Sequence, residues 1–180
     1  MATSGTTSFN LSIDEIIDEG YERCGLSTNQ GYDLRSARRS LDLLFAEWAN
    51  RGIHLWKVAL HENTLVSGQA EYSVSAGVSD VLEAFVSSTA AGSNTVNTQD
   101  VALTKIDRSA YSALPNKLAL GQPSQYYVSR ETTPKIYLYQ APNLSTYTVL
   151  KYYVIKRIED AGAYTNDADV VYRFLPCMCA

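Results

Sequence analysis

The residues of this chain that could do chemistry are two histidines, three cysteines and a run of carboxylates near the N-terminus. His54 and His61 are seven residues apart in a region where apolar residues alternate with a period of two. Side chains an odd number of positions apart in a β-strand point to opposite faces of the sheet. We therefore do not expect the two imidazoles to share a metal ion, and we interpret both as surface or edge histidines.

The cysteines, Cys24, Cys177 and Cys179, lack the spacing of a metal-binding or redox motif. Only one residue separates Cys177 from Cys179, whereas zinc sites pair cysteines across two or more residues and need a second pair elsewhere. We interpret all three as reduced thiols that face the core.

Five acidic residues line one face of the first predicted helix, and we interpret them as a solvated surface: Asp14, Glu15, Asp18, Glu19 and Glu22. The sequence contains no glycine-rich phosphate loop, no Gly-x-Ser-x-Gly turn and no His-Glu-x-x-His motif. The sequence therefore predicts a protein that is not an enzyme and that uses no catalytic residues, cofactor or metal.

Length and composition fit one globular domain of 180 residues with 46% hydrophobic residues and a net charge of −4. The charge argues against broad neutralisation of nucleic-acid phosphates, which needs clustered Lys and Arg. This net charge is compatible with a protein that surrounds DNA without binding it tightly. No apolar run approaches the roughly 18 residues of a membrane span, and the first ten residues do not resemble a secretory signal.

Two amphipathic helices are predicted at the start of the chain, forming a helical hairpin over residues 11–51. Ser12 and Glu15 form a capping-box pattern before the first helix. Gly25 and Gly52 are placed to end the two helices in left-handed caps. The apolar stripe of the second helix has a period close to 3.6 residues and consists of Leu34, Ala37, Leu41, Leu44, Phe45 and Trp48.

The remainder reads as mainly β over residues 53–158, with strands expected at 56–61, 71–75, 80–88, 125–130, 135–140 and 147–157. We expect Trp56 to pack the first strand under the hairpin. Residues 87–99 are predicted to form a mobile surface loop, and residues near 107–114 a short helix. Residues 168–180 are expected to begin a C-terminal helix capped by Asp167 or Asp169 and truncated within it. The fold class is therefore α+β, a helical hairpin packed with an antiparallel sheet in a single domain.

A basic stretch on the second helix allows two interpretations. Arg35, Arg38 and Arg39 are followed by Asp42, which can pair with Arg38 at the i,i+4 spacing. The simpler interpretation is a solvated helix face with local ion pairs. The functional interpretation is a subunit contact or the edge of a DNA channel, because arginine is enriched at interfaces.

The chain resembles the head-to-tail connector adaptors, also called tail tubular or head-completion proteins, of short-tailed bacteriophages. The resemblance lies in the collinear order of several segments: Tyr21–Leu26, Ala37–Trp56, Tyr111–Lys117, Gly121–Tyr127, Pro134–Pro142, Tyr152–Ala161 and Tyr172–Pro176. No single segment is a catalytic fingerprint. Together they span most of the chain from Ile13 onward.

The resemblance implies a homo-oligomeric ring, usually of twelve copies, that docks beneath the portal protein after DNA packaging. Such a ring extends the channel through which double-stranded DNA passes without sequence recognition, retains the packaged DNA and offers a docking face to the tail nozzle and fibres. It is a virion protein at the head–tail interface, is present in the host cytoplasm during assembly and needs no membrane. By the same resemblance, portal docking falls to Val170, Val171, Tyr172, Arg173, Phe174, Leu175 and Pro176. A loop at Ser93, Asn94, Thr95, Val96 and Asn97 becomes a contact to the nozzle or a neighbour.

A second function class also fits the sequence, a non-catalytic module that binds a carbohydrate or a peptide. Thirteen tyrosines are present, and six of them would form an exposed platform on the sheet: Tyr126, Tyr127, Tyr137, Tyr139, Tyr152 and Tyr153. The exposure of these side chains in the folded chain discriminates between the adaptor and the ligand-binding module.

Overall fold

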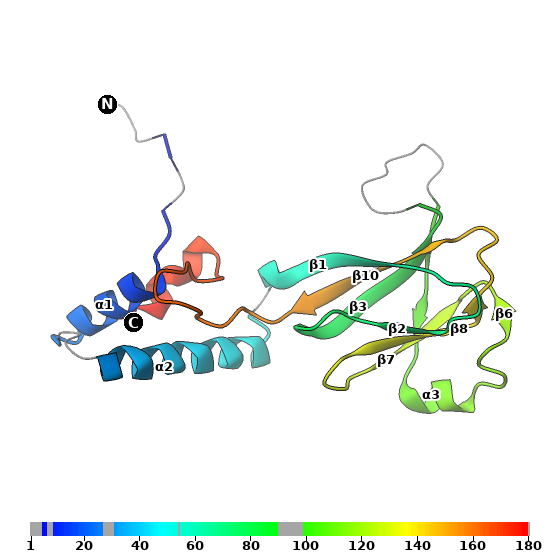
Figure 1. Cartoon of the computed structure of the whole chain (residues 1–180), viewed down its shortest axis with the longest axis horizontal. Helices are drawn as coiled ribbons and strands as arrows, with labels where there is room; N and C mark the ends of the chain where they lie inside the picture. Colours follow the sequence, from blue (N-terminus) through cyan, green and yellow to red (C-terminus); the bar gives the residue numbers. More distant parts are fainter. Residues whose placement is uncertain (1–4, 7–8, 27–30, 54, 90–98, 180) are drawn as a thin grey trace. The chain divides into compact units, whose positions relative to one another are not determined.

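The structure, a computed structural model, describes residues 5–6, 9–26, 31–53, 55–89 and 99–179. It is an α+β fold (Figure 1) in which two N-terminal helices precede the sheets and a short helix lies near the C-terminus. The sequence predicts a single domain, and the structure divides the chain into two compact units. The helical unit comprises Met1–Trp56 and Ile158–Ala180, and the β unit comprises Lys57–Arg157. Each unit has a hydrophobic core of its own, and the predicted packing of the hairpin against the sheet stays a prediction.

The first helix, α1 (Ile13–Arg23), begins and ends where the sequence predicts. The capping box is present, with the Ser12 N–H donating to the Glu15 carboxylate at 2.9 Å. At the other end Gly25 has φ +69°, and the amides of Gly25 and Leu26 return to the carbonyls of Glu22 and Tyr21. This is the Schellman arrangement, in which a glycine takes the left-handed conformation.

The second helix, α2 (Gly31–Asn50), ends in the same way at Gly52, which has φ +77°. Its predicted apolar stripe is confirmed, because Leu41, Phe45 and Trp48 are buried and the remaining members pack against them. Trp48 lies beside Phe45, with ring centroids 6.2 Å apart.

Residues 158–179 complete the helical unit by tying the two helices together. The first two amides of α1, those of Ile13 and Asp14, donate to the carbonyls of Asn166 and Tyr164 at 2.9 and 3.0 Å. These amides have no partner within the helix, so the returning chain satisfies them. On α2, the Asp42 carboxylate accepts a hydrogen bond from the Ala161 N–H at 2.8 Å. The hairpin is therefore closed by the C-terminal segment.

The predicted C-terminal helix over 168–180 is wrong in its extent. The chain forms a 3₁₀ turn, η2 (Tyr172–Phe174), and then the single-turn helix α4 (Leu175–Met178), with Pro176 in its first turn. Asp169 cannot act as the predicted cap because its carboxylate accepts from the Glu159 N–H and its carbonyl accepts from the Trp56 indole. Asp167 instead forms an isolated antiparallel bridge with Ser12.

The β unit is a small sandwich of two four-stranded sheets. One sheet has the order β1-β10-β3-β4, and the other has the order β2-β8-β7-β5. A helix, α3 (Arg108–Ala113), follows β5, and two short strands, β6 and β9, pair separately. The strand bounds are β1 (Val58–Thr64), β2 (Glu71–Ser73), β3 (Val78–Ser87), β4 (Asp100–Ala102), β5 (Thr104–Lys105), β6 (Leu120–Gly121), β7 (Gln125–Ser129), β8 (Lys135–Tyr139), β9 (Ala141–Pro142) and β10 (Val149–Lys156).

The inner faces of the two sheets form the core of the β unit. Val86, Leu150 and Val154 from the first sheet meet Ile136 and Leu138 from the second, all of them fully buried. The pairing is antiparallel except at β5–β7 and β6–β9, which are parallel. The six predicted strands are confirmed, with ends that agree to within three residues, while β4, β5, β6 and β9 were not predicted.

Two expectations about the first strand are wrong. A 3₁₀ turn, η1 (Leu55–Lys57), precedes β1, so Trp56 is not part of a strand. Its ring packs on Phe174 with centroids 5.1 Å apart, inside the helical unit. Both tryptophans of the chain thus belong to the helical unit. Tryptophan fluorescence will report on that unit alone.

The buried Tyr126 hydroxyl makes the β unit sensitive to alkali. It donates to the Leu82 carbonyl at 3.2 Å, and burial, with the negative charges of Asp80 and Glu83, raises the pKa of Tyr126 to about 12. The raised pKa contributes stability that is fully present below the ordinary tyrosine pKa of about 10 and is lost as the pH rises through 12. Two pKa units correspond to at most about 2.7 kcal/mol. We expect urea unfolding followed by tyrosine near-UV circular dichroism to show this loss.

The matched control is Tyr126→Phe, which keeps the ring and removes the titrating group. Tyr72 and Tyr152 also have pKa values raised by burial, so both proteins will lose some stability in alkali. The variant should lose less of it between pH 10 and 12. Identical pH slopes for the two proteins would contradict the assignment to Tyr126.

Candidate docking surface

Among the described residues, no group of three or more His, Cys, Asp or Glu side chains is arranged to hold a metal ion. His61 lies in β1 beside the Tyr152 ring, at a centroid distance of 6.1 Å. Burial, with the positive charge of Lys156, lowers the pKa of His61. His54 lies outside the described residues, so the predicted separation of the two histidines stays a prediction.

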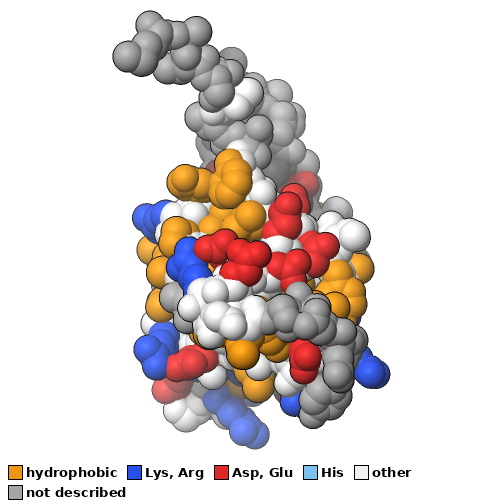
Figure 2. Space-filling model, turned by 90° about the vertical axis from the view of Figure 1, so that its left-hand side faces the viewer, with side chains coloured by type: hydrophobic (Ala, Val, Ile, Leu, Met, Phe, Trp, Pro, Cys, Tyr) orange, Lys and Arg blue, Asp and Glu red, His pale blue; other side chains and the backbone are white. Residues whose placement is uncertain are grey.

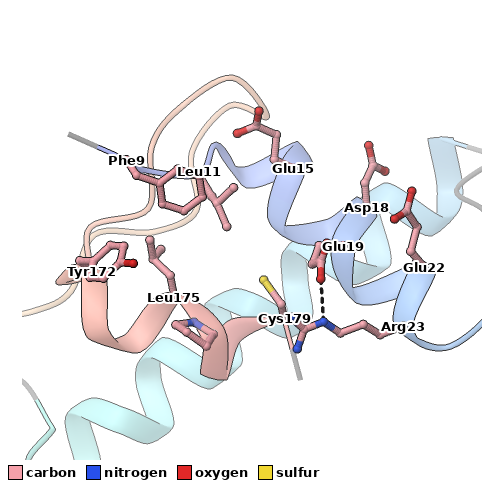
Figure 3. A pocket seen from close by; sticks show the side chains of 11 residues that line it. Phe9, Leu11, Glu15, Asp18, Glu19, Glu22, Arg23, Tyr172, Leu175 and Cys179 are labelled. Carbon is pink, nitrogen blue, oxygen red and sulfur yellow. Dashed lines mark hydrogen bonds and ion pairs between the residues drawn. The ribbon is translucent and has the colours of Figure 1, made fainter. Parts of the chain in front are cut away.

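The helical unit carries a groove between α1 and the C-terminal segment (Figure 3), with a cavity volume of about 490 Å³. We call it the α1 groove. Its walls are apolar on one side and acidic on the other. The apolar lining consists of Phe9, Leu11, Tyr172, Leu175, Pro176 and Cys179, and the charged lining of Glu15, Asp18, Glu19, Glu22 and Arg23.

Two exposed aromatic rings form one end of the groove. Phe9 and Tyr172 meet edge to face, with centroids 6.2 Å apart, and are 63% and 68% exposed. Aromatic rings of this size are normally buried, and an exposed pair beside polar residues is typical of an interaction site. Phe9 was not singled out in the sequence, although it is an isolated large apolar residue in a Thr- and Ser-rich segment.

The acidic wall follows the outer face of α1. In Figure 3 the carboxylates of Asp18 and Glu22 point away from the short helix α4, while Glu19 turns toward Arg23. The Arg23 Nε lies 2.8 Å from the Glu19 carboxylate. On the face shown in Figure 2, acidic side chains gather next to exposed hydrophobic ones. The surface thus combines negative charge with accessible apolar area.

The hydrogen bond from the Ser12 hydroxyl lowers the pKa of Asp14, which therefore keeps its negative charge over a wider acidic range than an isolated aspartate. Asp14 and Glu15 lie in the first turn of α1, where the helix dipole favours negative charge. The acidic character of this face is thus compatible with the stability of the helix that carries it.

The structure separates the predicted portal-docking residues into two groups. Leu175 is 3% exposed in the core of the helical unit, and Phe174 packs between Trp48 and Trp56 at 5.6 and 5.1 Å. Val170 also packs against this core. Tyr172, Arg173 and Pro176 are exposed, and Val171 is half-buried. Only the exposed members can contact a partner while the helical unit stays folded.

The predicted basic stretch lies on α2, but its residues have separate roles. Arg35 and Arg39 are exposed, whereas Arg38 is half-buried with its guanidinium 5.9 Å from the centre of the Tyr164 ring. The predicted Arg38–Asp42 ion pair is not among the ion pairs of the described residues. Asp42 instead bonds the Ala161 amide.

One further prediction has a mixed outcome, and another stays a prediction. The interpretation of all cysteines as core-facing is wrong for Cys24 and Cys177, which are exposed, and holds for Cys179. Cys24 lies at the last turn of α1, beyond the part of its stripe that the core covers. The loop residues 93–97 lie outside the described residues. The base of that loop is closed by the Ser88 amide, which donates to the Gln99 carbonyl at 3.1 Å.

The predicted tyrosine platform is divided between the core and the surface. Tyr126 and Tyr152 are each 1% exposed and cannot contribute to it. Three other tyrosines form a cluster between α3 and the outer face of β7 and β8: Tyr111, Tyr127 and Tyr137. Their centroids are 5.5 to 5.9 Å apart, so the rings cover one another.

Comparison of the chain with models of known protein families and with curated proteins yields no match. Within the part of the chain that the structure describes, no helix has the length and apolar character needed to cross a membrane.

Proposed function

We propose that this chain is a structural head–tail adaptor of a short-tailed bacteriophage. Copies of it, twelve by resemblance, form a ring under the portal protein, extend the DNA channel, retain the packaged DNA and dock the tail nozzle and fibres. The protein acts in the virion at the head–tail interface and is present in the host cytoplasm during assembly. The chemistry proposed is recognition between proteins, with no reaction.

The observation that carries the proposal is the collinear resemblance of segments from Tyr21–Leu26 to Tyr172–Pro176. The structure supports it in one respect. The segment that resembles the portal-docking tail is anchored in the core by Leu175 and presents Tyr172 and Arg173 to solvent beside the α1 groove. The Arg173 guanidinium lies 5.1 Å from the centre of the Phe174 ring. Tyrosine and arginine are the residue types that most often dominate protein interfaces.

The net charge of −4 supports the role proposed for DNA. A channel that releases a genome should not hold its phosphates, and tight non-specific binding requires many Lys and Arg contacts. Double-stranded DNA is therefore proposed to pass through the ring without sequence recognition.

The proposal predicts a specific docking defect for Tyr172→Ala. Loss of an exposed interface tyrosine should weaken binding to the portal ring by about tenfold or more. It should leave folding almost unchanged because Tyr172 is 68% exposed. Co-sedimentation with the portal ring from the same phage measures binding, and tryptophan fluorescence in urea measures the stability of the helical unit.

The matched control is Leu118→Ala, an equally exposed apolar side chain at 68% in the β unit. It should bind the portal as the unchanged protein does. Equal binding by Tyr172→Ala and Leu118→Ala would contradict the assignment of docking to the C-terminal segment.

A module that binds a carbohydrate or peptide is the second candidate, supported by the tyrosine cluster of Tyr111, Tyr127 and Tyr137. The Lys117 ammonium lies 5.6 Å from the centre of the Tyr111 ring, so a hydrogen-bond donor is present beside the aromatic rings. Titration of oligosaccharides while monitoring tyrosine fluorescence tests it, with Tyr127→Ala as the variant that should lose the response.

A further inference from the structure

We infer that the α1 groove of one copy binds the outer face of α2 of a second copy of this chain, in a head-to-tail contact. The inference deepens the proposed function and rests on it, because a ring needs such a contact between neighbours. It names the two surfaces that would form this contact.

The receiving surface is the α1 groove. Its acidic wall carries Glu15, Asp18 and Glu22, which are exposed along the outer face of α1. Its apolar end carries the exposed ring of Phe9, which lies beside the Tyr172 ring that is proposed to contact the portal. A groove with these two features fits a ridge that is basic along most of its length and apolar at one end.

The outer face of α2 is such a ridge. Arg35, Arg39 and Leu43 follow one another at intervals of four residues, so they lie one above another on the same side of the helix. All three are exposed, and Leu43 is 66% exposed. Leu43 thus adds exposed apolar area at one end of a row that is otherwise basic.

The spacing of the two surfaces matches in an antiparallel register. Asp18 and Glu22 are also four residues apart, about 6 Å along the helix axis. If Arg35 lies opposite Glu22, then Arg39 lies opposite Asp18. Leu43 follows Arg39 by one helical turn, so it lies opposite the N-terminal end of α1, where the apolar end of the groove is located. The charges are thus complementary at Glu22 and Asp18, and Leu43 reaches the end of the groove where Phe9 lies.

A second copy of this chain is the expected partner because one chain carries both surfaces. The α1 groove and the outer face of α2 lie on two different helices. A contact between two different patches is heterologous, and it produces closed rings when the rotation between neighbours permits. Charge complementarity of this kind chooses the partner and the register as well as adding affinity.

The test is a charge exchange. One variant carries Asp18→Lys with Glu22→Lys, and a second carries Arg35→Glu with Arg39→Glu. Glutamate and lysine are both good helix formers, so both helices should be retained. A third variant combines all four changes. A control reverses two acids elsewhere, Glu83→Lys with Glu159→Lys, which changes the net charge as the first variant does.

Ring formation on the portal is followed by electron microscopy. Each two-site variant should lose the ring or require about tenfold more protein to form it, whereas the four-site variant and the control should form it normally. An equimolar mixture of the two two-site variants should also form it, because each interface then pairs opposite charges. Rings that persist in both two-site variants would overturn the inference while leaving the proposed function intact.

If the unchanged protein forms no ring on the portal, the proposed function fails and sedimentation of the protein alone at low salt decides the inference. Self-association that is weakened by each two-site variant and restored in the four-site variant would support the contact. An absence of salt-dependent self-association would overturn it.

Discussion

Leu175→Ala is expected to lower the free energy of unfolding of the helical unit by about 2–4 kcal/mol, the usual cost of truncating a buried leucine. Leu175 is 3% exposed and packs in one core with residues of α1 and α2. Its removal leaves a cavity where the C-terminal segment holds the hairpin. The family resemblance assigns the same residue to portal docking, so this variant separates a role in folding from a role in recognition.

Tryptophan fluorescence in urea is the appropriate measurement because both tryptophans lie in the helical unit. Tyr172→Ala, three residues away and exposed, is the control and should change the free energy of unfolding by less than about 0.5 kcal/mol. If Leu175→Ala were as stable as Tyr172→Ala, the segment would not be part of the core. Leu175 would then again be a candidate for contact with the portal.

Leu138→Ala is expected to lower the free energy of unfolding of the β unit by about 2–5 kcal/mol. Leu138 is fully buried in β8. Its strand is flanked by β2 and β7, and its side chain lies in the core between the two sheets. Neighbouring strands limit how far the site can collapse, so the expected range extends above the one given for Leu175→Ala.

Near-UV circular dichroism of the tyrosines measures this effect, since Tyr72, Tyr126 and Tyr152 line the same core. Leu118→Ala removes the same number of atoms from an exposed position and should have little effect. A loss below about 1 kcal/mol for Leu138→Ala would show that the core is not closed at this point.

The elements with a strong local signal were the ones that the sequence predicted. The caps at Ser12, Gly25 and Gly52 and the 3.6-residue stripe of α2 depend on neighbouring residues only, and all are confirmed. Strands such as β8 were found because turns bracket them. The two-residue strands β5 and β6 carry no periodicity, and their parallel pairing depends on distant residues.

The failures concern residues whose environment is decided by distant parts of the chain. Trp56 follows α2 directly, and its place against Phe174 depends on a segment more than a hundred residues later. Asp42 was expected to pair with Arg38 one turn away, but the Ala161 amide offers a hydrogen bond at 2.8 Å. The α1 groove was missed for the same reason, because Phe9 and Tyr172 come together only in the folded chain.

The measurement that most directly tests the adaptor proposal is electron microscopy of the full-length protein mixed with the portal ring of its own phage. The account predicts a second ring, stacked on the narrow end of the portal and sharing its rotational symmetry. A portal that stays bare at saturating protein would contradict the adaptor function, and the tyrosine cluster of the β unit would then be the surface to test for ligands.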